Sequence, residues 1–268
     1  MPARILAIPF IVLLGSLLYL ALLVDDDYST WLVMPLIGLA TIWVLSPQIN
    51  WWWYRRNPPD LPGAVRPMLF QYPFYQRLPE GEKKRFRSRV ALFAMANEFI
   101  PQIMEKVPDD LKYMVSACAV TTTFGQEHFL FKKFENIVVA PKPFPTPQYP
   151  DKFHASELYE PDGVVLFAAE QLALGFMQSK QYFNIGLYEY AKVFKISYPQ
   201  QPYPVLDESH WEALERISGF SKARIAQWIN LPDIDQSAVG IAHFFTFPEA
   251  FRSELPAIFE SYRRVFKL

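Results

Sequence analysis

The fold is decided by the stretch Tyr182-Phe183-Asn184-Ile185-Gly186-Leu187-Tyr188-Glu189-Tyr190-Ala191-Lys192-Val193-Phe194. Apolar residues recur along it at helical spacing, which predicts a helix that faces protein on most sides. Glu189 and Lys192 are the only full charges inside the stretch. Because residues three and four apart share a helix face, Tyr188, Glu189 and Lys192 form one polar stripe. This stripe is the first candidate for a functional site.

The stripe has the spacing of a His-Glu-x-x-His zinc helix. In that motif two histidines one turn apart bind the metal, and the glutamate is the general base. Here Tyr188 and Lys192 stand at the histidine positions, and Glu189 keeps the position of the glutamate. The frame of the motif is present without its imidazoles.

The run Asn184–Lys192 resembles the zinc-helix region of the Mlc titration factor A family of glucose-regulated zinc peptidases, whose members carry Asn-(Val/Leu)-(Val/Ile)-(Leu/Ile)-His-Glu-Phe-Ala-His. Three other segments resemble family segments in the same order: Leu78–Phe86, Ile137–Phe144 and Ala242–Phe251. The resemblance covers residues 77–268. It implies an α+β, mostly helical, zincin-like domain with a small sheet.

The resemblance implies a zinc site that this sequence does not complete. Catalytic zinc takes about three protein ligands with free lone pairs and one water. An ordinary tyrosine phenol and an ordinary lysine ammonium keep their protons near pH 7. The family's third ligand, a carboxylate, falls at Asp235 when counted back from Phe244. We therefore expect no zinc and no catalytic residue, and we treat Tyr188, Glu189, Lys192 and Asp235 as positions of a degenerate site.

Lys192 suggests a substitute for the metal. Without a cation, buried carboxylates are destabilising in an interior of low dielectric constant. One hypothesis places the Lys192 ammonium between Glu189 and Asp235, where it would hold two helices in register. The alternative is that the Lys192 side chain extends to the surface and leaves both carboxylates.

The N-terminal sequence predicts a membrane anchor. Residues 5–24 contain no charge, and at about 1.5 Å per residue they are long enough to cross a hydrocarbon core of about 30 Å. A second apolar span covers residues 29–46. The alternative for the first span, a cleaved signal peptide, usually has an apolar region of only about 7–15 residues. We expect residues 1–56 to form a transmembrane helical hairpin.

The flanking charges predict the orientation of the hairpin. Arg4 precedes the first span, Arg55 and Arg56 follow the second, and the loop 25–30 has no basic residue. Basic residues accumulate on the cytoplasmic side, so we expect a multi-pass protein of the inner, cytoplasmic membrane with both termini in the cytoplasm. An aromatic and basic anchor at the inner interface is expected from Trp51, Trp52, Trp53, Tyr54, Arg55 and Arg56.

The remaining chain divides into a tether and a folded domain. Five prolines in residues 57–76 exclude a long helix there and predict a short, stiff tether. The domain, residues 77–268, should contain helices at 80–99 and 109–120, strands at 134–139 and 163–169, several helices after 205, and one amphipathic helix at 251–266. The strand 163–169 is either a former peptide-binding edge of the sheet or purely structural.

Composition excludes several classes of function. The chain of 268 residues has a formal net charge of −1, which gives no nucleic-acid signal. Its single cysteine, Cys118, lies in an apolar segment and excludes a disulfide within the chain. The four histidines, which are too far apart in the sequence for metal-ligand spacing, are His128, His154, His210 and His243.

These observations favour a membrane-anchored, catalytically inactive zinc-peptidase-like protein that is a binding or structural subunit. Its partners would be the membrane, other membrane-protein subunits and a possible soluble protein or peptide. Two alternatives stay open. One is an active membrane-bound zinc peptidase with atypical ligands, and the other is a sensor that binds a peptide or a transcription factor in the old groove.

Overall fold

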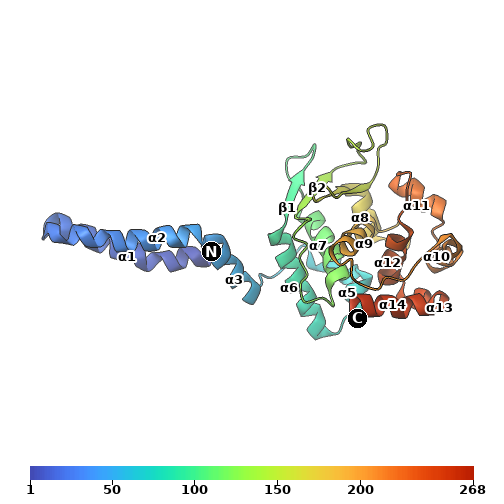
Figure 1. Cartoon of the computed structure of the whole chain (residues 1–268), viewed down its shortest axis with the longest axis horizontal. Helices are drawn as coiled ribbons and strands as arrows, with labels where there is room; N and C mark the ends of the chain where they lie inside the picture. Colours follow the sequence, from blue (N-terminus) through green and yellow to red (C-terminus); the bar gives the residue numbers. More distant parts are fainter. The chain divides into compact units, whose positions relative to one another are not determined.

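The uncharged N-terminal sequence forms a hairpin of helices. Helix α1 (Pro2–Leu23) and helix α2 (Val33–Val44) lie side by side, joined by the 3-10 helix η1 (Asp26–Leu32) (Figure 1). At the turn, the Asp25 carboxylate accepts the Asp27 N–H at 3.1 Å. The stretches Pro2–Leu23 and Asp26–Val44 are both long and apolar enough to cross a membrane. Their length and composition therefore fit the expected hairpin.

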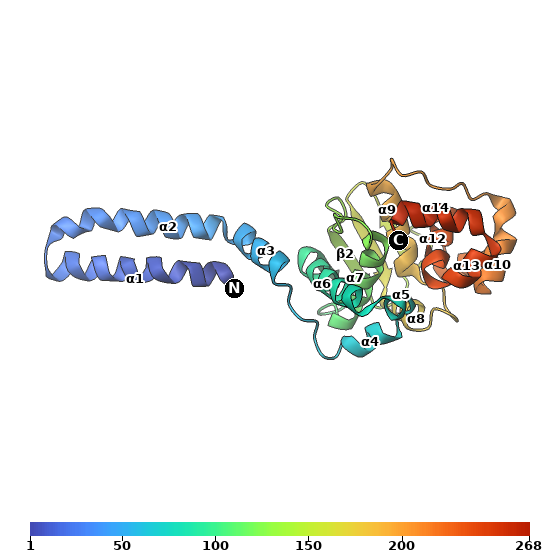
Figure 2. The same cartoon turned by 90° about the horizontal axis from the view of Figure 1, so that it is seen from below.

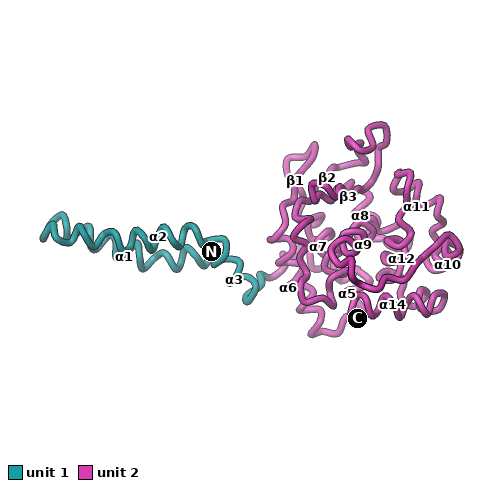
Figure 3. The backbone as a smooth tube through the Cα atoms, in the orientation of Figure 1, with its two compact units in different colours: residues 1–59 teal, residues 60–268 magenta.

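The chain separates into two compact units in the computed structural model, which describes residues 1–268 (Figure 3). Unit 1 is Met1–Pro59 and ends with helix α3 (Ser46–Arg56); unit 2 is Asp60–Leu268. The elements of unit 2 are α4 (Arg66–Gln71), α5 (Pro73–Arg77), α6 (Glu80–Ala96), β1 (Glu98–Pro101), α7 (Asp109–Thr123), β2 (Asn136–Ala140), β3 (Ser156–Tyr159), β4 (Val164–Ala168), α8 (Ala169–Met177), α9 (Ile185–Ser197), η2 (Glu208–His210), α10 (Trp211–Ser218), α11 (Lys222–Ile229), α12 (Gln236–Thr246), α13 (Pro248–Glu254) and α14 (Pro256–Phe266).

Unit 2 is mostly helical and has one four-stranded sheet, which confirms the α+β class. The strand order is β1-β2-β4-β3. Strands β1, β2 and β4 are parallel, and β3 runs antiparallel to β4. The predicted strand at 163–169 is observed as β4, but it is an inner strand with a partner on each side. It is therefore not an edge that could hold a peptide, and β3 takes the edge position.

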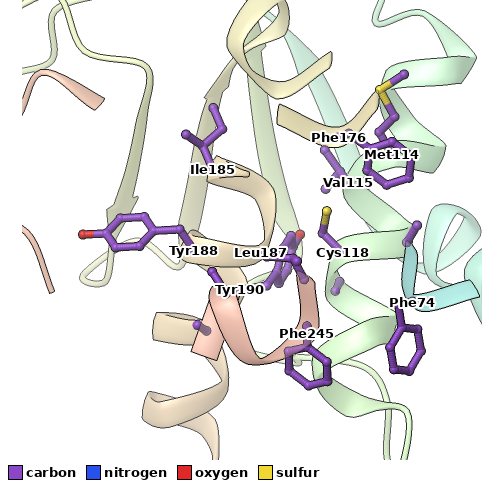
Figure 4. Close-up of a cluster of buried hydrophobic side chains, with 14 of the residues drawn as sticks. Phe74, Met114, Val115, Cys118, Phe176, Ile185, Leu187, Tyr188, Tyr190 and Phe245 are labelled. Atoms are coloured by element: carbon purple, nitrogen blue, oxygen red, sulfur yellow. The ribbon is translucent and has the colours of Figure 1, made fainter. Parts of the chain in front are cut away.

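The core of unit 2 is built around two buried helices, α7 and α9, which pack against each other. They approach so closely that a Cβ placed on Gly186 of α9 would lie 2.7 Å from the Cys118 Sγ of α7. Figure 4 shows Cys118 and Leu187 in this shared core, with the Tyr188 ring extending from α9 in another direction. The absence of a side chain at Gly186 is therefore what lets the site helix sit against α7.

The segment expected to be a tether is largely part of the domain. Its prolines do prevent a long helix, since α4 and α5 have only six and five residues. The apolar residues between the prolines are buried in the main core, among them Leu61, Leu69 and Tyr75. Only Asn57, Pro58 and Pro59 lie between α3 and the beginning of unit 2. Proline spacing reports the lack of a helix but not whether a segment is buried.

Two helix boundaries also differ from expectation. The helix expected over 80–99 ends at Ala96, because Glu98–Pro101 leaves it to pair with β2 as strand β1. The single helix expected over 251–266 is broken at Leu255 into α13 and α14, and Pro256 begins α14. Proline lacks the N–H that would continue the first helix but suits the first position of the second.

Replacing Gly186 by alanine tests the close approach of α7 and α9. The added methyl group would collide with Cys118, so we expect Gly186→Ala to lower the free energy of unfolding of the full chain by about 1–3 kcal/mol. The measurement is chemical denaturation in detergent. Gly81→Ala is the matched control, because no atom lies within 4 Å of a Cβ at that helical position. We expect it to leave stability unchanged or to raise it by up to about 1 kcal/mol.

Candidate functional site

The polar stripe lies on helix α9, which begins directly after Asn184. The Asn184 side chain caps this helix by accepting the Leu187 N–H at 3.0 Å. The cap fixes where the helix starts and so sets which residues form its polar face. Tyr188 and Glu189 are buried on this helix, and the Lys192 side chain is only 19% exposed.

Glu189 is fully buried, with one carboxylate oxygen in a hydrogen bond and the other in an ion pair. Oε1 accepts a hydrogen bond from the Ser156 Oγ of strand β3 at 2.7 Å. Oε2 lies 2.5 Å from the Lys192 Nζ. The ammonium therefore turns inward and neutralises the buried carboxylate, which excludes the alternative in which Lys192 extends into solvent. A buried carboxylate with one oxygen hydrogen-bonded and the other in an ion pair is shielded from water.

Asp235 does not share the Lys192 ammonium, so the second half of the hypothesis is wrong. Its carboxylate pairs with Lys195, one turn further along α9, at 3.0 and 3.3 Å. Asp235 is the N-cap of α12, where it also accepts the Ala238 N–H at 3.0 Å. This position draws the carboxylate toward the helix N-terminus of α12. Two ion pairs on α9 therefore replace the single shared cation that we expected.

Tyr188 is a neutral phenol that contacts both Asp235 and Lys192. Its oxygen accepts the backbone N–H of Asp235 at 3.0 Å. Burial raises the pKa of Tyr188 above its ordinary value, and the negative charge of Glu189 raises it further. The Lys192 Nζ lies 4.8 Å from the centre of the Tyr188 ring, where the face of the ring favours a cation. Tyr188 is thus a structural partner of α12 and Lys192.

The donor set at these positions does not fit zinc. A protonated phenol and an ammonium offer no suitable lone pair, and Asp235 is engaged by Lys195. No group of three His, Cys, Asp or Glu side chains lies together anywhere in the chain in an arrangement for a metal ion. The structure therefore gives no residues through which metal chemistry can be derived, and the expectation that zinc is not bound stays a prediction.

A second buried polar cluster lies beside the first and was missed in the sequence. His154 Nε2 is 2.9 Å from Glu157 Oε2, and Thr146 Oγ1 donates to the same oxygen at 2.6 Å. The other ring nitrogen, Nδ1, is 3.0 Å from the Lys152 carbonyl oxygen. Both ring nitrogens thus lie within hydrogen-bond distance of an oxygen atom.

The environment of Glu157 favours the ionised form of its carboxyl. Burial raises the pKa of its carboxyl, but the hydrogen bonds from His154 and Thr146 and the nearby positive charges of His154 and Lys192 outweigh burial, so that the pKa lies below its ordinary value. Lys192 therefore lies near two buried carboxylates, Glu157 and Glu189. The only sequence signal for this cluster was the three-residue spacing of His154 and Glu157, which does not reveal contact with α9.

The other histidines do not join either cluster. His243 on α12 is buried among Phe183, Phe220 and Phe247, and neither of its ring nitrogens has a hydrogen-bond partner. Burial lowers the pKa of His243 to about 3, so the ring is neutral at pH 7. His210 instead caps η2 through Asp207.

The outer edge of β3 is partly covered by the protein's own chain. The Ala155 N–H donates to the Ile229 carbonyl oxygen at 2.8 Å, and Asn230 Nδ2 donates to the Phe153 carbonyl oxygen at 2.8 Å. The end of α11 therefore occupies hydrogen-bonding groups at the entrance to this strand. A peptide binding along β3 would find this part of the edge already taken.

The expected membrane anchor forms helix α3. This helix borders a cavity of about 640 Å³, which is lined by Gln48, Trp51, Trp52, Arg55 and Arg56. The Arg56 guanidinium lies 3.9 Å from the centre of the Trp52 ring. Trp52 and Trp53 remain about half exposed. An assignment of these residues to a membrane interface stays a prediction.

The mostly helical fold, its small sheet and the polar helix α9 can now be compared with known protein families. Residues 50–196 match the family model described as "Glucose-regulated metallo-peptidase M90". The match spans more than half of the chain, which therefore belongs to this family. A comparison with curated proteins finds no match. The matched region includes Tyr188, Glu189 and Lys192 and ends before Asp235.

Removing the Lys192 ammonium tests the buried ion pair. Lys192→Met would leave Glu189 buried and unpaired, so we expect the free energy of unfolding to fall by about 3–5 kcal/mol. Denaturation of the full chain in detergent gives this value. The double variant Glu189→Gln/Lys192→Met should recover most of the loss, since no charge is then left buried.

Lys195→Met is the matched control on the same helix. Lys195 and Asp235 are more exposed, with side-chain exposures of 29% and 34%, so we expect a loss below about 1 kcal/mol. Equal losses for the two lysine variants would contradict the assignment of Lys192 as the required counter-charge.

Proposed function

We propose that this chain is a membrane-anchored, catalytically inactive member of the M90 family that is a binding or structural subunit of a membrane complex. One observation carries the proposal: the Lys192 ammonium is paired with Glu189 on the helix where the family's zinc-binding imidazoles are expected. A cation with no lone pair replaces a metal ligand, and the general-base carboxylate is the group that it neutralises. Hydrolysis by a metal-activated water then lacks both the metal ligands and the general base.

The surroundings of the site support the same reading. Glu189 is fully buried, and the edge of β3 is partly covered by Ile229 and Asn230. Substrate hydrolysis needs a base in contact with water and an open place for the peptide. The buried Glu189 has no contact with water, and Ile229 and Asn230 take part of the place for a peptide. A packed scaffold without an open site suits a role in binding or assembly.

The hairpin supports a role within a membrane. In our proposal α1 and α2 span the inner membrane, both termini lie in the cytoplasm, and unit 2 is cytoplasmic. Of the two glycine positions that could admit another helix, Gly38 is already filled by the Phe10 ring. Gly15 has no atom within 4 Å of the place where a Cβ would stand. Small residues let membrane helices approach closely, so Gly15 is the contact point that we assign to a partner helix.

Metal content separates this proposal from an active peptidase. We expect the full chain, purified in mild detergent without chelator, to contain far less than one zinc per chain, because Tyr188 and Lys192 offer no suitable lone pair. Elemental analysis measures the ratio, and thermal unfolding with and without a chelator should give the same midpoint. One zinc per chain together with chelator-sensitive cleavage of a peptide would overturn the proposal.

Co-purification tests the role of the hairpin. We expect membrane proteins that co-purify with the full chain in mild detergent to be lost from Gly15→Leu, because the larger side chain prevents close approach of a second helix. Val12→Leu, also on the exposed surface of α1, is the control and should retain them. A soluble partner that binds both variants equally would favour the sensor alternative over the subunit.

A further inference from the structure

A surface cavity at the beginning of unit 2 has the chemistry of an anion site. Its volume is about 380 Å³. The residues that line it come from the first segment of unit 2, from α4 and α5 and from α6, and they are Asp60, Arg66, Leu69, Phe70, Tyr75 and Arg87. The cavity lies entirely within unit 2 and is separate from the site on α9.

The two arginines in this cavity are weakly neutralised. Arg87 has no carboxylate within ion-pair distance, and its guanidinium donates to the Tyr75 hydroxyl. Arg66 reaches only Asp60, at 3.8 Å, and these side chains are 51% and 97% exposed. An exposed ion pair of this length contributes little and is easily exchanged. Two guanidinium groups are thus available to a phosphate, which arginine binds with paired hydrogen bonds.

An exposed aromatic ring adjoins the arginines. Phe70 is 59% exposed although its neighbours Met68 and Leu69 are buried. Its ring packs edge-on against Tyr75, with 5.8 Å between ring centres, so it is held in place on the rim of the cavity. An exposed ring beside basic groups is the combination with which peripheral segments enter a membrane interface.

The covalent chain limits where this cavity can lie. Helix α3 ends at Arg56 and unit 2 begins at Asp60, so only three residues connect them. A residue of extended chain spans at most about 3.6 Å, so this connection is short compared with a folded unit of over 200 residues. The cavity includes Asp60 itself. The cavity is therefore formed by the part of unit 2 that follows the anchor most directly in the chain.

We propose that Arg66 and Arg87 bind the phosphate of an anionic phospholipid in the membrane that holds the hairpin, with Phe70 inserted at the headgroup boundary. The proposal rests on the membrane insertion included in the proposed function. It assigns the start of unit 2 as a docking surface that restrains the unit against the bilayer. The occupant is a lipid because the surface combines charge with an apolar ring and lies next to the anchor in the chain, whereas a free phosphate would have no use for Phe70.

The test uses the full chain in nanodiscs with one fluorescent label near the cavity. The only native cysteine, Cys118, is buried, so Gln71→Cys supplies a single exposed thiol on α4. An environment-sensitive dye there is read for its emission shift and for quenching by lipids with a spin label near the headgroup. Discs contain phosphatidylcholine alone or with phosphatidylglycerol. We expect a blue shift and quenching that increase with the anionic lipid.

Matched labels and variants locate the effect. A dye at Val205→Cys, in the segment between α9 and α10, reports another side of unit 2, since Figure 2 shows this segment and α4 at opposite edges of the unit. It should show no quenching. Arg66→Gln/Arg87→Gln should reduce the docked-to-undocked ratio at Gln71→Cys by about fivefold for each arginine. Arg252→Gln/Arg263→Gln removes the same charge from exposed positions on α13 and α14 and should change nothing.

The outcomes separate this proposal from its basis. If the chain is not retained in membranes after alkaline carbonate washing, membrane insertion fails, and the docking proposal falls with it. If insertion holds but the signal at Gln71→Cys ignores lipid charge or the Arg66 and Arg87 variants, only the docking proposal is overturned. It is also overturned if inorganic phosphate binds the detergent-solubilised chain through the two arginines while the nanodiscs give no signal.

Discussion

A buried carboxylate requires a counter-charge, and the arrangement of unit 2 depends on how Glu189 obtains one. Lys192, three residues away on the same helix, supplies it at 2.5 Å. Ser156 binds the other oxygen of Glu189, which connects the helix to strand β3. One turn before Glu189, the missing side chain of Gly186 allows α9 to approach Cys118 of α7. The helix is thus held by polar contacts at Glu189 and by close packing at Gly186.

Polar residues of α9 also connect this helix to α12. They form two separate ion pairs and a hydrogen bond through the phenol of Tyr188. Lys195 and Tyr188 both meet Asp235 at the start of α12, so the two helices remain connected. The family match includes α9 up to residue 196, whereas the partner on α12 is established by the geometry of the fold. The residues of the polar stripe therefore hold α9 in place against its neighbours.

The sequence predicted the elements whose pattern is local. Helices α7 and α9 and strands β2 and β4 have strong apolar patterns and were found close to their expected positions. Strands β1 and β3 have four residues each and were missed, because a neighbouring strand and not local preference makes them extended. The burial of residues 60–77 was missed for a related reason, since prolines reveal a lack of helix but not a place in the core.

In the candidate site, too, the local spacing was predictable from the sequence, whereas the contacts between distant segments were not. Spacing alone placed Tyr188, Glu189 and Lys192 on one face, because helix geometry is fixed. Whether Lys192 or Lys195 meets Asp235 depends on the rotation of α9 relative to α12, which no local pattern encodes. The contact of Thr146 with Glu157 needs a loop to fold back, and the bridge between Phe144 and His154 closes that loop.

The two edge strands of the sheet, β1 and β3, affect how readily copies of the chain join through their sheets. An unpaired strand edge is a template on which a second molecule can add and begin an aggregate. Strand β1 is short and ends at Pro101, which has no N–H to offer, and the entry to β3 is covered by Ile229 and Asn230. The end of β1 and the entry to β3 are therefore poor places for a second molecule to add a strand.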